Sequence, residues 1–342
     1  MKIIAIVSGK GGVGKTTTTA NLGAALAHLV KKKVVVIDAN FITPNLGWHL
    51  GVNKYKSTFL EVLQGKVQIS QAIHAHRSGA GLIPSTPSSY TIRSASDTIR
   101  RVLEELKGYD MILIDTTPGV ESEVFPVMDI SDGILVVTNP EPTAVADCHR
   151  TLKIADRVGA HVIGIVLNRV RREKYELSVE EVESVCGASV VAIIPERKEV
   201  RRSIVVGNPV VLNSPHSPAA VEFKKLAASL AGKKYRMKFA DKIRLILTFK
   251  WRKVELKEPK IPVEKQIKEM AIEVTPPPPA VAIPEVPKTK KKEDGRKSST
   301  AKEIEELLAT LKEQYETGML PENTYMNLKG ANEKKLKELR RT

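Results

Sequence analysis

A glycine-rich run near the start of the chain constrains the fold more than any other feature. It follows a short apolar segment and fits the pattern G-x-x-x-x-G-K-[ST]: Gly9-Lys10-Gly11-Gly12-Val13-Gly14-Lys15-Thr16. Between a strand and a helix, such a run forms a loop whose backbone N–H groups surround phosphate oxygens at the helix N-terminus. The sequence therefore predicts a strand, a phosphate-binding loop and a helix, in that order.

Strand-like and helix-like segments alternate over residues 1–232. Short continuous apolar runs, typical of strands covered on both faces, occur at residues 2–7, 34–38, 81–84, 111–115, 133–138, 161–168 and 189–194. Helical patterns occur at residues 16–30, 94–107, 143–158 and 217–231. This alternation predicts an α/β fold with a doubly wound, mostly parallel sheet flanked by helices, in which ligands bind at the carboxyl ends of the strands.

The remainder of the chain has a different composition. The whole sequence carries 54 Lys and Arg against 39 Asp and Glu, a net charge of +15, and residues 233–300 hold 19 basic and 9 acidic residues. A stretch rich in proline and lysine buries too little apolar surface to fold and is predicted to be a linker. We therefore expect four parts: a nucleotide-binding domain at 1–232, a basic helix at 233–254, the linker at 255–299 and a small helical hairpin at 300–342.

Composition also excludes several classes of protein. Aromatic residues make up only 4% of the sequence, which argues against a stacking surface for single-stranded nucleic acid. Cys148 and Cys186 form no C-x-x-C pair, so neither a zinc ribbon nor a disulfide scaffold is expected, and both are interpreted as buried, inert thiols. Neither a signal peptide nor an apolar run of roughly 20 residues is visible, so we expect an intracellular protein.

Two side chains of the loop have expected roles in binding a nucleotide. Lys15 is predicted to reach the β- and γ-phosphates, and the Thr16 hydroxyl is predicted to ligate Mg²⁺. Lys10 is a second lysine, which a generic phosphate loop does not need. With the residues that follow, it makes the loop resemble the deviant phosphate loop of the MinD/ParA family of ATPases.

This resemblance implies a cofactor, an oligomeric state and a set of contacts. The cofactors are ATP and Mg²⁺, and the active form is an ATP-bound homodimer in which Lys10 contacts the partner's nucleotide. The alternative for Lys10 is a solvated lysine on an exposed turn. By the same resemblance, nucleotide contacts are expected from Gly11, Gly12, Val13, Gly14, Lys15, Thr16 and Thr17.

Further segments resemble the family's switches and its adenine pocket. Asp38-Ala39-Asn40 resembles the first switch, and Asp115-Thr116-Thr117-Pro118-Gly119 resembles the second. Asp38 and Asp115 are expected to hold Mg²⁺ together with Thr16, partly through water. The family's adenine pocket is matched by Asn168, Arg169, Pro195 and Glu196.

The first switch departs from the family at one position. Asn40 stands where the family usually has a second Asp that helps to position the attacking water, and asparagine cannot take a proton. The hypothesis is that ATP hydrolysis is slow; the alternative is that Asn40 orients the water adequately. Catalysis is expected to depend on Lys10, Lys15, Asp38 and Asn40.

The segment after the nucleotide-binding domain is strongly basic. Residues 233–254 contain nine basic residues and one acidic residue, Asp241. On a helix, one broad apolar face would be formed by Tyr235, Phe239, Ile243, Ile246, Leu247 and Trp251. This pattern is typical of a helix that binds an anionic membrane surface, and MinD proteins carry such an anchor near the C-terminus. A helix docked on the domain and a DNA-binding patch are alternatives, but large apolar residues would have no role against phosphate.

The last 42 residues are predicted to form a helical hairpin. Apolar residues recur at helical spacing from Ile304 to Tyr315, Gly318 ends that helix, and Pro321 can start the next. The stretch Tyr315-Glu316-Thr317-Gly318-Met319-Leu320-Pro321-Glu322 resembles the short helical modules known as SHOCT domains. That resemblance implies an interaction or oligomerisation module.

The expected function is that of a MinD-type switch. ATP would drive dimerisation, the dimer would bind the cytoplasmic face of the membrane, and hydrolysis would release it, so that a cargo is positioned or partitioned during cell division or spatial organisation. The cargo and the activating protein are unknown. The alternative is a ParA-like partitioning ATPase whose basic tail binds DNA. Metal-cluster carriers of the same superfamily are disfavoured because they use closely spaced cysteines.

Overall fold

The computed structural model describes residues 1–88, 96–119 and 124–235, with the single residues 312 and 329. Its sheet has eight strands. They are β1 (Lys2–Val7), β2 (Val34–Asp38), β3 (His74–Ala75), β4 (Gly81–Ile83), β5 (Met111–Asp115), β6 (Gly133–Thr138), β7 (Val162–Val170) and β8 (Val190–Pro195). All seven predicted strands are present, with ends that differ by at most two residues.

The strands form one sheet in the order β3-β4-β2-β5-β1-β6-β7-β8. The short strand β3 pairs antiparallel with β4, and every other neighbouring pair is parallel. Strands β2 to β5 lie on one side of β1, and β6, β7 and β8 follow in order on the other side. The sheet is therefore doubly wound, as the sequence predicts. The carboxyl ends of β1, β2, β5, β7 and β8 therefore lie along one edge, where a ligand is expected in this architecture.

Helices connect the strands. In chain order they are α1 (Lys15–His28), α2 (Leu46–His49), α3 (Phe59–Leu63), the 3₁₀ turn η1 (Ile69–Ala72), α4 (Ser96–Glu104), α5 (Phe125–Asp129), α6 (Pro142–Arg157), α7 (Val179–Cys186), α8 (Lys198–Val206), α9 (Val210–Asn213) and α10 (Pro218–Leu230). Predicted helices correspond to α1, α4, α6 and α10. Helix α1 ends earlier than expected, and Lys31, just beyond it, adopts a positive φ of 57°, which a right-handed helix does not accommodate.

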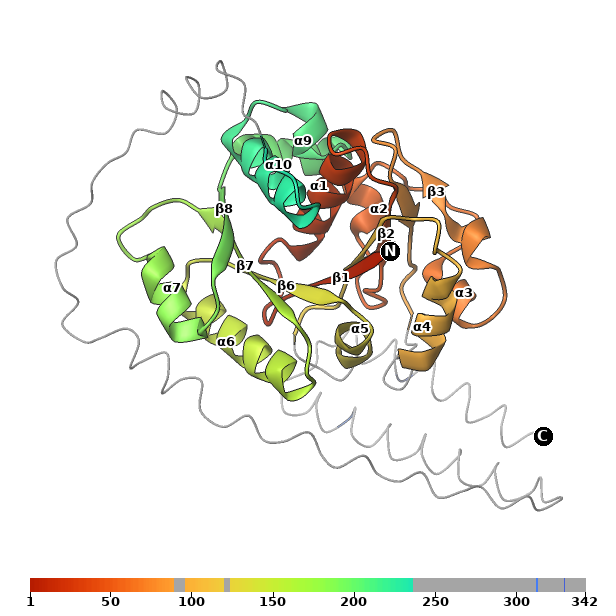
Figure 1. Ribbon diagram of the computed structural model, residues 1–342, viewed down its shortest axis with the longest axis horizontal. Coiled ribbons are helices and arrows are strands. Elements are labelled where there is room, and N and C mark those ends of the chain that lie inside the picture. Colours follow the sequence, from red (N-terminus) through yellow and green to blue (C-terminus); the bar gives the residue numbers. More distant parts are fainter. Residues whose placement is uncertain (89–95, 120–123, 236–311, 313–328, 330–342) are drawn as a thin grey trace. The chain divides into compact units, whose positions relative to one another are not determined.

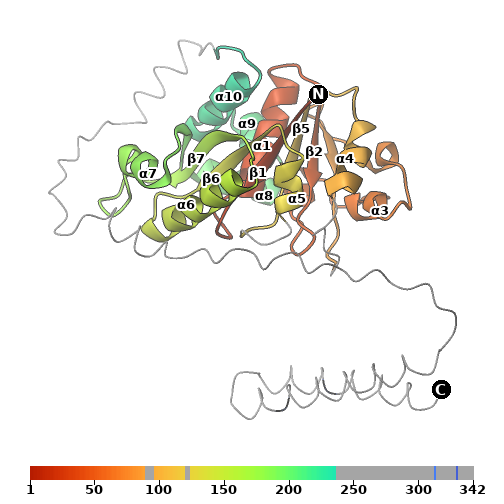
Figure 2. The same cartoon turned by 60° about the horizontal axis from the view of Figure 1, so that its bottom comes forward.

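Helices cover both faces of the sheet (Figures 1 and 2), and an apolar layer lies between the sheet and the helices on each face. Alternate residues of each strand point to opposite faces, so Ala5 and Val7 pack on one side while Ile4 and Ile6 pack on the other. The first layer lies under α3 to α7, and the second lies under α1, α2, α9 and α10. This double burial explains why the strands are continuous apolar runs.

The basic helix expected at 233–254 lies almost entirely outside the described residues, as do the linker and the C-terminal hairpin. Residues 233–235 are described and are not helical. In the described part of the chain, no helix is both long enough and apolar enough to cross a membrane.

Candidate functional site

The glycine-rich loop joins β1 to α1 and has the backbone that its glycines permit. Gly12 and Gly14 adopt positive φ values of 79° and 99°, which side chains disfavour. A Cβ on Gly14 would also lie 2.1 Å from Asn168 Nδ2, and that amide donates a hydrogen bond to Val13 O at 2.7 Å. Asn168, predicted for the adenine pocket, therefore also fixes the loop from the end of β7.

A buried lysine and a buried aspartate face each other beside the loop. Lys15 Nζ lies 3.8 Å from Asp115 Oδ1, and their side chains are 7% and 0% exposed. Thr19, one turn along α1, donates its hydroxyl to the same oxygen at 3.2 Å. The other oxygen, Asp115 Oδ2, is buried without a hydrogen-bond partner among the described residues. An acceptor of this kind suits a cation or a water bound to one, so these residues fit Mg²⁺.

Asp38 ends β2 directly opposite Asp115 in the sheet register. Its two carboxylate oxygens accept the backbone N–H groups of Asn40 and Leu46, each at 3.0 Å. Burial, with the negative charge of Asp115, raises the pKa of Asp38 to about 7, although both N–H groups and Lys15 act in the opposite direction. A carboxylate with this pKa can take up or release a proton at neutral pH.

The Asn40 side chain closes the loop that follows β2. Its Nδ2 donates to Thr43 O at 2.9 Å and to Thr43 Oγ1 at 3.1 Å, while its Oδ1 accepts from Thr43 N at 3.0 Å. The residue is only 4% exposed. Both ends of the amide are thus engaged within the loop predicted to be the first switch, a role that the sequence did not indicate.

Lys10, in the same loop, is exposed. Its Nζ donates to Thr143 Oγ1 at a long distance of 3.4 Å, near the start of α6. The loop packs tightly on this helix, because a Cβ on Gly9 would lie 2.4 Å from Asp147 O. Helix α6 therefore backs the loop and supports Lys10.

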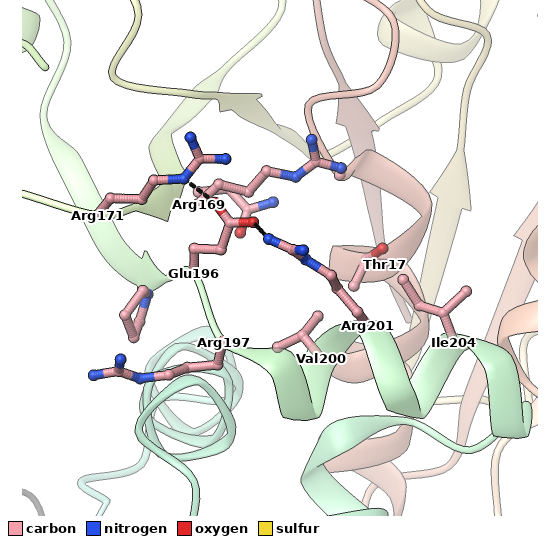
Figure 3. A pocket seen from close by; sticks show the side chains of 11 residues that line it. Thr17, Arg169, Arg171, Glu196, Arg197, Val200, Arg201 and Ile204 are labelled. Carbon is pink, nitrogen blue, oxygen red and sulfur yellow. Dashed lines mark hydrogen bonds and ion pairs between the residues drawn. The ribbon is translucent and has the colours of Figure 1, made fainter. Parts of the chain in front are cut away.

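A cavity of about 320 Å³ opens beside the loop (Figure 3). The four residues predicted for the adenine pocket lie together in its wall with Gly14 and Thr17. The complete lining consists of Gly14, Thr17, Asn168, Arg169, Arg171, Pro195, Glu196, Arg197, Val200, Arg201 and Ile204. The structure thus joins the ends of β7 and β8 to the phosphate loop in one hollow.

Glu196 is held between two arginines in this wall. Its carboxylate forms ion pairs with Arg171 and Arg201, which flank it in Figure 3. The hydrogen bond from Arg171 lowers the pKa of Glu196 below its usual range, Arg201 adds to this, and burial acts against both. These two arginines were not predicted for the pocket. Their positions in the sequence could have indicated them, since Arg171 directly follows β7 and Arg201 lies on α8, the helix after β8.

Cys148 and Cys186 are both buried, as predicted. They come from α6 and α7, and the structure brings their side chains into contact. The hydrogen bond to Cys186 and burial raise the pKa of the Cys148 thiol well above its usual value. A thiol of this kind is a poor nucleophile, which supports the prediction of inert side chains.

Comparisons with known proteins show the family of the chain. The ParA family model, described as the NUBPL iron-transfer P-loop NTPase, matches residues 1–231. An uncharacterized ATP-binding protein of Methanocaldococcus jannaschii is 36% identical over 241 residues, which are 70% of this chain and 91% of the relative. The septum site-determining protein MinD of Synechocystis sp. is 33% identical over 239 residues, covering 68% and 90% of the two chains.

A solved structure agrees as well. The septum site-determining protein MinD of Pyrococcus horikoshii, complexed with Mg-ADP, is 33% identical and superposes with a TM-score of 0.63 over 69% of this chain and 99% of its own. Sheet order, phosphate loop and sequence all lead to the same group of proteins. The chain belongs to the ParA/MinD family of P-loop ATPases.

Proposed function

We propose that this chain is an ATP-dependent switch of the MinD type, which dimerises on ATP, binds an anionic membrane surface and leaves it after hydrolysis. The observation that carries the proposal is the cluster at the ends of β1, β2 and β5. There, buried Lys15 lies 3.8 Å from Asp115, and Asp38 stands opposite Asp115. A cation and two carboxylates beside a glycine-rich loop suit the binding and hydrolysis of Mg–ATP.

The residues of the cluster divide the work of binding. Lys15 would contact the β- and γ-phosphates, while the N–H groups of the loop would surround their oxygens: those of Gly11, Gly12, Val13, Gly14, Thr16 and Thr17. The Thr16 hydroxyl would bind Mg²⁺, and Asp38 and Asp115 would hold its waters. When bound, Mg²⁺ neutralises charge that develops on the phosphate oxygens during hydrolysis.

The cavity beside the loop is proposed to take the adenosine part of the nucleotide. Asn168, Arg169, Pro195 and Glu196 lie in its wall next to Gly14 of the loop. Its volume of about 320 Å³ lies at the lower end of the range usual for small-molecule sites. A base held there would place its phosphates at the N-terminus of α1.

Lys10 is proposed to act across a homodimer interface. It is exposed, and its 3.4 Å hydrogen bond to Thr143 is long. A lysine held this weakly can exchange its partner for a phosphate of a second protomer at little cost. ATP would thereby be enclosed between two copies of the chain.

Changing Lys10 to alanine should weaken ATP-dependent dimerisation by about 10- to 100-fold, since a charge-assisted hydrogen bond to phosphate is lost. ADP binding by the monomer should persist. Light scattering with Mg–ATP measures the dimer. The matched control is Lys107→Ala, because Lys107 is 75% exposed and pairs only loosely with Glu104. Normal dimers in Lys10→Ala would contradict the role in trans.

Hydrolysis is proposed to be slow because Asn40 cannot take a proton. Its amide is bonded to Thr43 at both ends, so it is committed to the loop rather than to a water. The ATP-bound dimer would then be long-lived.

Changing Asn40 to aspartate should raise the steady-state ATPase rate by roughly tenfold or more, because a general base typically contributes at least this much. Phosphate release under saturating Mg–ATP measures the rate. Asn53→Asp, at an exposed site, adds the same charge and should leave the rate unchanged. Equal rates in wild type and Asn40→Asp would show that the missing carboxylate does not limit hydrolysis.

The membrane surface is proposed to be bound by the basic helix at 233–254. Its apolar face, with Phe239, Ile243, Ile246, Leu247 and Trp251, would enter the interface while lysines and arginines face anionic headgroups. The relationship to MinD proteins supports this assignment. A ParA-like protein that binds DNA through the same basic residues is the second candidate, favoured by the excess of positive charge there.

Co-sedimentation of the full chain with anionic liposomes and, separately, with DNA tests the proposal. Each arm is run with and without ATP. ATP-dependent pelleting with liposomes supports the MinD-type switch, whereas pelleting with DNA alone favours the partitioning ATPase.

The helical hairpin at 300–342 is proposed to be a SHOCT-like interaction module that connects the switch to a cargo or an activating protein.

A further inference from the structure

A histidine on α2 connects the first switch to the phosphate-loop helix. His49 Nδ1 lies 2.9 Å from Asn45 O, and His49 Nε2 lies 3.2 Å from Thr17 Oγ1. A carbonyl oxygen only accepts hydrogen bonds, so Nδ1 carries a proton and donates it to Asn45. The state of Nε2 then decides which way the Thr17 hydroxyl donates.

Burial favours the neutral form of the ring. Burial lowers the pKa of His49 below 6.5, although the bond to Asn45 O and the negative charge of Asp115 act against it. With Nδ1 protonated, neutral His49 presents a lone pair at Nε2, and Thr17 donates its only hydroxyl proton to it. The Thr17 oxygen therefore has only lone pairs left for the neighbouring cavity, whose wall it helps to form.

A phosphate beside Thr17 requires the opposite arrangement. Phosphate oxygens accept hydrogen bonds and are repelled by lone pairs, so the Thr17 hydroxyl can bind one only by turning its proton away from His49. Nε2 would then lose its donor. A proton taken from solvent restores the bond in reverse, because the His49 cation donates Nε2–H to Thr17 Oγ1, while the added positive charge favours the nearby phosphate.

We propose that His49 is a positioning residue for the Thr17 hydroxyl, and that a bound nucleotide reverses the Thr17–His49 hydrogen bond. The inference rests on the proposed nucleotide site. Helix α2 is well placed to transmit the change, because it begins at Leu46, whose N–H holds Asp38 Oδ2 at 3.0 Å. One short helix thus connects the Thr17 hydroxyl at its end to the switch carboxylate at its start.

The charges around His49 come from several elements. Helix α2 packs on α1, β2 and α8, and Asp115 on β5 acts on the ring through its charge. The ionisable residues on these elements are Lys15, His28, Asp38, Asp115, Lys198, Glu199, Arg201 and Arg202. All of them remain in each variant below, so a difference between variants isolates His49 and Thr17.

Proton uptake on ADP binding tests the inference. The full chain is titrated calorimetrically with ADP and Mg²⁺ at pH 6.5 in two buffers of different ionisation enthalpy, and the difference in heat counts the protons taken up. A bound state with the higher His49 pKa binds more protons, so ADP affinity rises as pH falls through that pKa. Wild type should take up a measurable fraction of a proton more than His49→Gln, which cannot ionise.

Three further variants exclude a merely structural effect. Thr17→Val, which lacks the hydroxyl, should lose the extra uptake, and Thr17→Ser should retain it. Thr18→Val is the matched control, because the Thr18 hydroxyl donates only to Gly14 O at 2.9 Å. Equal uptake in wild type, His49→Gln and Thr17→Val would overturn the inference, as would an equal loss in Thr18→Val. Absence of any ADP binding by wild type would overturn the proposed nucleotide site itself.

Discussion

Alanine at position 15 should abolish measurable binding of Mg–ADP and Mg–ATP. Lys15 is the buried cation of the site, 3.8 Å from Asp115, and its removal leaves Asp38 and Asp115 facing the phosphates without a compensating charge. Hydrogen bonds to charged groups contribute about 1.5–3 kcal/mol each, and the repulsion adds to that loss. We expect affinity to fall by at least about 100-fold. Equilibrium titration with a fluorescent ADP analogue measures it.

The variant must be separated from a folding defect. Breaking a buried ion pair can cost about 3–5 kcal/mol of stability, so thermal unfolding without nucleotide is measured alongside binding. Protonation of Asp38, whose pKa is already about 7, can relieve part of that cost. Lys107→Ala provides the same change of side chain at an exposed site. A folded Lys15→Ala protein that binds ADP within a few-fold of wild type would contradict the assigned site.

The strands of the sheet were predicted well from short apolar runs, because burial of a strand on both faces determines the residue type at each of its own positions. A strand covered on both faces must be apolar at every position, and β1, β2, β5 and β6 have the predicted bounds. The two-residue strand β3 was not predicted, because so short a segment shows no periodic pattern of apolar residues. Short helices such as α2 and α9, each four residues long, escape detection for the same reason.

The sequence proposes residues for the site but not the contacts between them. The motif places Lys15 and Thr16 because their neighbours in sequence build the loop. The pairing of Thr17 with His49, or of Asn168 with Val13 O, joins segments that only the fold brings together. Asn40 shows most clearly how prediction and structure differ. Its residue type suggested that it orients the attacking water, whereas in the structure both ends of its amide form hydrogen bonds with Thr43.

Glutamate at both Phe239 and Ile246 should remove ATP-dependent binding to anionic liposomes. Each substitution replaces an apolar residue of the predicted anchor with a charge, at about 2 kcal/mol or more of lost burial per residue. One such helix binds weakly, but two in an ATP-bound dimer bind as a linked pair, which can raise avidity by roughly 10²–10⁴. Co-sedimentation with phosphatidylglycerol liposomes, with and without ATP, measures the loss.

The matched control is Leu245→Glu with Phe249→Glu. On a helix these residues lie off the apolar face, so this pair changes the net charge equally while leaving that face intact. It should retain most of the liposome binding, whereas Phe239→Glu with Ile246→Glu should lose it and keep its ATPase activity in solution. Both pairs keep every lysine and arginine, so any DNA binding should fall only modestly in either.

These two double variants distinguish membrane binding from DNA binding, because both surfaces attract the basic residues but only one of them requires the apolar face. Salt weakens both modes, since each brings basic residues to an anionic surface. Anionic headgroups attract each cationic residue by about 1 kcal/mol, and DNA phosphates attract the same residues. Only a membrane also takes up the apolar face, because only a membrane offers an apolar interior in which that face is buried. If Phe239→Glu with Ile246→Glu still sediments with liposomes as wild type does, the anchor is wrong, and a DNA-binding tail becomes the better account of residues 233–254.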